Sequence, residues 1–121
     1  MTADGAPILD TAVIAELRAA TGDDDEFIAD LIESYLTEGQ ANVDSLSAAA
    51  AQSDLAMFTR AAHTLKSTSA TVGAIRLSEI CRDLEEAARS GRAEGLAGAA
   101  ERVQETWLET IAAIAAAGLS A

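Results

Sequence analysis

Residues 27–46 read FIADLIESYLTEGQANVDSL, and this stretch decides the fold. Apolar side chains recur along it every three or four residues, which is the period of an amphipathic α-helix. Gly39 interrupts the composition of the stretch but not its period. We predict one long helix over residues 24–51, which Asp23 and Glu26 begin with the spacing of a capping box.

The same period continues on both sides of this helix. Asp10 is a suitable N-cap for a short helix that Gly22 ends, and Ser53 is one for a helix that ends at Gly73. A further helix ends at Gly91, and a last one occupies most of the remaining chain. The apolar stripes of these helices are expected to form the core, with Phe27, Ile28, Tyr35, Val43, Leu46, Phe58, Leu65, Ser69, Val72, Leu77, Cys81, Ala88, Val103, Trp107 and Ile114 among their members.

Length and composition agree with this pattern. The chain has 121 residues, of which 50% are hydrophobic and 3% aromatic, and it contains one proline. We therefore predict a single domain over residues 1–121, with residues 1–9 as a tail. Helices joined by short connections favour an all-α fold, an antiparallel up-down-up-down four-helix bundle with a short extra N-terminal helix.

Charge and residue counts exclude several classes of function. The formal net charge of −12 makes nucleic acid and anionic membranes poor partners, and its self-repulsion favours a monomer. One cysteine and one histidine leave no intrachain disulfide and no plausible metal cluster. Because no signal peptide or membrane-spanning run is recognisable, we expect a cytoplasmic protein.

The only histidine, His63, lies on the polar side of its predicted helix. At 100° per residue it is about 140° from Phe58, so it should face solvent. Lys66, the only lysine of the chain, follows one turn later. Small or polar neighbours on the same side would form a docking surface that leaves the imidazole accessible: Ala56, Thr59, Arg60, Ser67 and Ala70.

Spacing alone does not establish a function for this pair. Most exposed histidines and lysines on amphipathic helices are ordinary solvated side chains. A neutral imidazole is nevertheless a competent nucleophile at neutral pH, and a lysine one turn away would offer a flexible positive charge to a phosphoryl group bound there. The segment around His63 also differs from the rest, because residues 55–92 hold six basic and four acidic residues in an otherwise acidic chain.

Residues 62–74 read AHTLKSTSATVGA and are followed by Leu77, Cys81, Leu84 and Glu85. This pattern closely resembles the signature of histidine-containing phosphotransfer (HPt) domains, and the resemblance extends over essentially the whole chain. Ser67 departs from the family pattern, which more often has glycine at that position. Its hydroxyl would either crowd an approaching receiver or hydrogen-bond the phosphoryl oxygens, so this departure concerns the transfer rate and the choice of partner more than the role itself.

The resemblance implies a four-helix bundle without catalytic activity or a cofactor of its own. His63 would accept a phosphoryl group from the aspartate of a receiver domain or from a histidine-kinase phosphorelay, and pass it to another receiver aspartate. Lys66 would interact with that phosphoryl group. The implied partners are response-regulator receiver domains, a hybrid histidine kinase, or both, and the receiver would bring Mg²⁺.

Glu85 allows two interpretations. In the family the matching position is often polar and touches the histidine ring, so a carboxylate there would accept from Nδ1 and leave Nε2 as the nucleophile. Alternatively, Glu85 is a solvated surface side chain in the run DLEE of residues 83–86.

Two other functions compete with phosphotransfer. A helical adaptor could bind a receiver or kinase domain without carrying phosphoryl, although it would have no need for the His63 and Lys66 pair. A small enzyme is disfavoured because no nucleophile motif or phosphate-binding loop is present. The identities of donor and acceptor, the direction of phosphoryl flow and the signalling output do not follow from the sequence.

Overall fold

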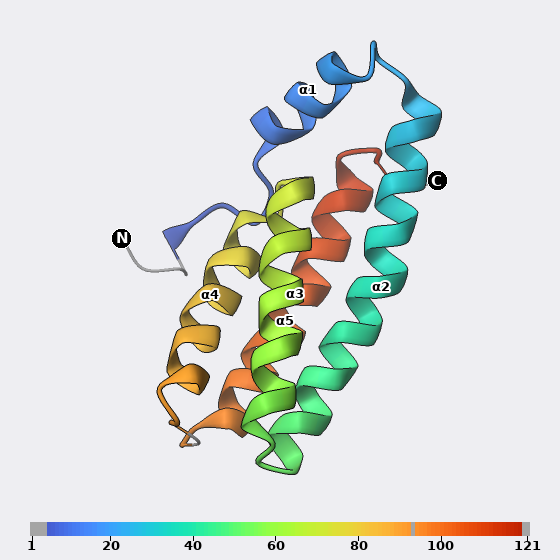
Figure 1. The fold of residues 1–121 in the computed structure, drawn as a ribbon. Helices are drawn as coiled ribbons and strands as arrows, with labels where there is room; N and C mark the ends of the chain where they lie inside the picture. Colours follow the sequence, from blue (N-terminus) through green and yellow to red (C-terminus); the bar gives the residue numbers. More distant parts are fainter. Residues whose placement is uncertain (1–4, 93, 120–121) are drawn as a thin grey trace.

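The computed structural model describes residues 5–92 and 94–119, and these residues form helices without strands. The helices are α1 (Thr11–Ala20), α2 (Asp25–Ala51), α3 (Leu55–Val72), α4 (Ile75–Arg89) and α5 (Leu96–Ala116), as Figure 1 shows. Within the described part of the chain, each of these helices is too short or too polar to cross a membrane.

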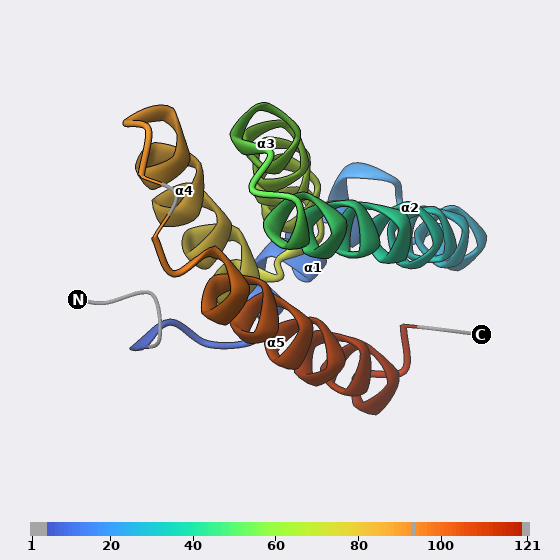
Figure 2. The ribbon, with the colours of Figure 1, turned by 90° about the horizontal axis from the view of Figure 1, so that it is seen from below.

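Helices α2 to α5 form the predicted bundle. Each runs antiparallel to the one before it (Figure 1), and the view in Figure 2 shows them arranged around a common centre in chain order. Contacts join α2 to α3, α3 to α4, α4 to α5, and α5 back to α2, so α3 and α5 are diagonal to each other. Helix α1 contacts only α2 and α3 and lies at the end of the bundle where α3 finishes. The predicted fold class is therefore confirmed.

Aspartates begin the first three helices. Asp10 accepts a hydrogen bond from the backbone N–H of Ala12 at 2.9 Å, as predicted. The other two predicted caps are wrong by one residue, since Asp24 replaces Asp23 and Asp54 replaces Ser53. Both displaced residues have positive φ angles, 62° and 52°, which place them in the preceding turn rather than in the extended conformation of an N-cap.

The core consists of the predicted stripes. The largest fully buried side chains come from all four bundle helices: Trp107, Phe58, Ile28, Ile32, Leu46, Leu65, Leu77, Ile80, Ile114, Val43, Val72 and Val103. Phe27 was expected in this set but is 48% exposed, because it lies about 100° around α2 from the buried Ile28 of the same turn and so faces away from the core. Tyr35 is buried, donates or accepts a hydrogen bond with the Ser69 hydroxyl at 2.8 Å, and makes an edge contact with Trp107.

The start of the chain is packed more closely than the predicted tail. Ala6 is buried, and its carbonyl accepts from Nε of Arg76 at 2.8 Å. The backbone N–H of Arg76 donates to the carbonyl of Pro7 at 3.0 Å. The prediction of a tail is therefore wrong for Ala6 and Pro7, whereas residues 1–4 lie outside the described part.

Gly39 explains how α2 and α5 approach each other. A Cβ atom at this position would lie 2.9 Å from Cζ3 of Trp107 and closer still to Cη2. The indole fills the space that the missing side chain leaves, and its Nε1 donates to the side-chain oxygen of Gln40 at 2.9 Å.

We expect Gly39→Ala to destabilise the bundle by about 1–3 kcal/mol through overpacking against Trp107. Intrinsic helix propensity alone would give the opposite sign, a stabilisation of up to about 1 kcal/mol. Gly98→Ala on α5 is the matched control, because nothing lies within 4 Å of the added methyl group. Urea unfolding of the two variants measures the difference, and equal stabilisation by both would contradict the close α2–α5 contact.

Candidate functional site

His63 lies on the exposed side of α3, as the helical period predicts. Its side chain is 53% exposed. The opposite face of α3 is buried, since Ala62, just before His63, and Leu65, two residues after it, are fully buried. The predicted docking surface also faces outward: Ala56, Arg60, Ser67 and Ala70 are exposed, and Thr59 is half-buried.

Glu85 lies beneath the imidazole and comes from the neighbouring helix α4. One of its carboxylate oxygens, Oε2, lies 2.8 Å from Nδ1 of His63. The Glu85 side chain is only 4% exposed, because α4 carries it toward α3, between the buried residues Cys81 and Ala88. The interpretation of Glu85 as a solvated surface side chain is therefore wrong.

Two cations complete the neighbourhood of this carboxylate. Nζ of Lys66 donates to Oε1 of Glu85 at 2.6 Å, and its side chain is 30% exposed. Arg89, one turn further along α4, lies with NH2 2.7 Å from Oε2. The site thus joins His63 and Lys66 from α3 with Glu85 and Arg89 from α4.

Arg89 was missed in the sequence, although a signal for it exists. It stands four residues after Glu85, the spacing at which oppositely charged side chains on a helix meet. Its relevance to the site depends on the position of Glu85 beside His63, which the sequence does not give. Ser78 adds a fixed point between the same two helices, since its hydroxyl donates to the backbone carbonyl of Lys66 at 2.8 Å.

The donors around Glu85 determine its charge. The Lys66 hydrogen bond is the main cause that holds the pKa of Glu85 below its ordinary value, helped by His63 and Arg89 and opposed by burial. The carboxylate is therefore ionised at neutral pH and can only accept hydrogen bonds. Nδ1 of His63 must then carry the proton of the neutral ring, which leaves the lone pair on Nε2.

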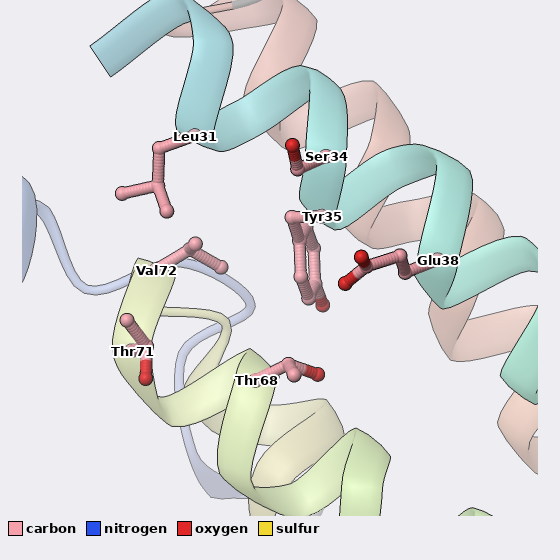
Figure 3. Close-up of a pocket in the computed structure, with 7 residues that line it drawn as sticks. All are labelled: Leu31, Ser34, Tyr35, Glu38, Thr68, Thr71 and Val72. Atoms are coloured by element: carbon pink, nitrogen blue, oxygen red, sulfur yellow. The ribbon is translucent and has the colours of Figure 1, made fainter. Parts of the chain in front are cut away.

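Two buried titratable side chains, Cys81 and Tyr35, lie elsewhere in the core. Burial raises the pKa of the Cys81 thiol to about 12, so the thiol stays protonated, which agrees with its predicted place in the core. Burial also raises the pKa of Tyr35, whose ring extends from α2 toward α3 beside a hollow of about 110 Å³ (Figure 3). The hollow is lined mainly by aliphatic, hydroxyl and phenol groups, with Glu38 as its carboxylate.

The imidazole of His63 lies on an open surface of the bundle, with its side chain 53% exposed. The imidazole is oriented from below by a buried carboxylate, and its outer side is open. Small side chains at positions 56, 67 and 70 leave room for a second molecule to approach.

Comparison with known proteins identifies the family. Residues 30–117 match the model of the Hpt domain. The structure is similar to the crystal structure of histidine-containing phosphotransfer protein B (HptB) from Pseudomonas aeruginosa PAO1, with a TM-score of 0.78 and 28% sequence identity over 88% of this chain and 90% of that one. A search of curated proteins finds no match. With most of its length matched by the family model, the chain belongs to the Hpt family of phosphotransfer proteins, which act in two-component signalling.

Proposed function

We propose that this protein is a phosphorelay intermediate that accepts a phosphoryl group on Nε2 of His63 and passes it to a receiver domain. The observation that supports this most strongly is the hydrogen bond between Nδ1 and the buried Glu85 carboxylate. It orients the ring and selects the tautomer whose Nε2 is nucleophilic. An ordinary solvated histidine would have no such buried partner.

In the proposed reaction, the Nε2 lone pair attacks the phosphorus of an acyl phosphate on a receiver aspartate. The N–P bond forms, the O–P bond breaks, and the aspartate carboxylate leaves with the electron pair. The proton on Nδ1 stays in its hydrogen bond to Glu85. Lys66 offers positive charge to the phosphoryl oxygens, and Mg²⁺ belongs to the receiver, so this chain needs no cofactor of its own.

The proposed partners are receiver domains of response regulators, a hybrid histidine kinase, or both. The docking surface of Ala56, Thr59, Arg60, Ser67 and Ala70 surrounds an accessible histidine, as docking of a receiver active site requires. We propose that the chain acts there as a carrier and not as an enzyme. The alternative of a phosphoryl-free adaptor is less well supported, because adaptor binding requires neither a fixed tautomer nor the Lys66 pair with Glu85.

Transfer from phosphorylated receiver domains tests the proposal. The purified chain is mixed with each receiver carrying a radiolabelled phosphoryl group, and the label on the chain is followed over time. We expect label that is lost in acid and kept in alkali, as is typical of phosphohistidine, and its later appearance on a second receiver. Stable binding to receivers without any acid-labile label would favour the adaptor.

Ser67→Arg should slow transfer from a cognate receiver about tenfold or more while stability stays within about 0.5 kcal/mol. Ser67 is exposed one turn beyond His63, so a long cationic side chain there would obstruct the approaching receiver. Ala112→Arg is the matched control, since it adds the same group at an exposed position of α5, diagonal to α3. Equal transfer rates for the two variants would place the docking surface elsewhere.

A further inference from the structure

Glu85 receives more donors than the orientation of His63 requires. Oε2 lies within hydrogen-bond distance of both His63 and Arg89, at 2.8 and 2.7 Å, and Oε1 accepts from Lys66 at 2.6 Å. A neutral amide would suffice to accept from Nδ1. The carboxylate therefore adds a negative charge that ring orientation alone does not explain.

A count of charges shows what this carboxylate does to the phosphorylated site. With the ring neutral, Glu85, Lys66 and Arg89 together carry a charge of +1. After transfer the phosphoryl group carries about −2, and the ring, which keeps its Nδ1 proton, carries +1. The phosphorylated site is then neutral, whereas a glutamine in place of Glu85 would leave it at +1. The carboxylate thus withdraws one unit of positive charge from beneath the phosphoryl group.

The contact of Glu85 with Lys66 acts in the same direction. Its Oε1 holds the Lys66 ammonium on the helix side of the site, where it competes with the phosphoryl oxygens for the same cation. Its Oε2 keeps the proton on Nδ1, as an amide oxygen also would, so this contact does not depend on the negative charge. The hold on Lys66 favours departure of the phosphoryl group over its retention.

We propose, resting on the phosphorelay function above, that Glu85 is a positioning residue that biases His63 toward donating its phosphoryl group. Its carboxylate keeps phosphohistidine less stable than an uncharged hydrogen-bond acceptor would. At equilibrium, more of the phosphoryl group is therefore on the receiver aspartate than it would be if His63 and Lys66 acted without Glu85.

Glu85→Gln isolates the charge from the hydrogen bond. Two donors converge on Oε2, so the amide oxygen should take that place and keep the bond to Nδ1. The amide NH₂ then faces Lys66 and releases it toward the phosphoryl group. Arg89→Gln removes a positive charge from the same network and should have the opposite effect.

The test is a competition between two chains. Isotope-labelled wild type and an unlabelled variant are mixed with one receiver domain that exchanges phosphoryl with the wild type, and intact mass spectrometry measures the phosphorylated fraction of each at equilibrium. Because both chains draw on the same receiver, its own properties cancel from the ratio.

We expect Glu85→Gln to hold roughly tenfold more phosphoryl than wild type, the effect of one unit charge at short range, and Arg89→Gln to hold several-fold less. The double variant should return close to the wild-type ratio. Glu86→Gln is the matched control, since it removes the same charge from an exposed neighbour on α4 and should leave the ratio near one. The proposal is overturned if Glu85→Gln partitions equally with wild type, loses phosphoryl, or matches Glu86→Gln. If no receiver domain exchanges phosphoryl with the wild type, so that the competition cannot be set up, the phosphorelay function itself is refuted.

Discussion

The His63→Gln variant is expected to accept no phosphoryl group from any receiver, while its free energy of unfolding changes by no more than about 1 kcal/mol. Nε2 of His63 is the proposed nucleophile, and no second histidine exists to replace it. The ring is half exposed and outside the core, and a glutamine amide can still donate to Glu85. Radiolabel transfer and urea unfolding measure the two halves of this prediction.

The two outcomes that would contradict this prediction are distinct. Residual acid-labile label would mean that another residue is the acceptor. A large loss of stability together with the loss of transfer would mean that His63 is a structural member of the α3–α4 contact, and the missing transfer would then say nothing about chemistry.

The Lys66→Ala variant is expected to accept phosphoryl several-fold more slowly and to lose it by hydrolysis several-fold faster. An exposed charge contact is worth up to about 1 kcal/mol, and it strengthens when a docked receiver excludes water. Lys66→Arg should recover only part of the rate, because a planar guanidinium on a different stem cannot place its charge identically. Binding of the unphosphorylated chain to a receiver should change much less than either rate.

Arg82→Ala is the matched control for Lys66→Ala. It removes one positive charge from α4, where Arg82 pairs only with its neighbour Asp83 at 3.5 Å among the contacts described, away from Glu85. A time course of transfer and of subsequent hydrolysis separates the two variants. If Lys66→Ala behaves as Arg82→Ala does in both phases, the lysine contributes only to the overall charge of the domain.

The fold could be predicted because each helix carries its own period. The stripe through Phe58, Leu65 and Val72 on α3 is buried as expected, and it places His63 on the opposite, exposed side. The first residues of α2 and α3 were predicted one position too early. The loop before each helix offers two adjacent residues that can act as the N-cap: Asp23 beside Asp24, and Ser53 beside Asp54. The choice depends on the φ angles of the turn, which the side-chain type does not determine.

Only the residues of the site that share one helix could be predicted from the sequence. His63 and Lys66 share α3, and their spacing is visible in the sequence. Whether Glu85 is buried depends on where α4 crosses α3, because the same residue on an isolated α4 would border the polar face. The sequence therefore left its two interpretations open, and Arg89, whose partner is Glu85, was not identified.

The most direct test of the central claim is NMR of the phosphorylated chain prepared with isotope-labelled histidine. The single histidine produces a single set of imidazole signals, so the modified nitrogen can be assigned without ambiguity. We predict that the phosphoryl group is bonded to Nε2 of His63, with the proton on Nδ1 protected from exchange by Glu85. Phosphorylation on Nδ1, or an unmodified imidazole in a chain that carries phosphoryl elsewhere, would contradict the account.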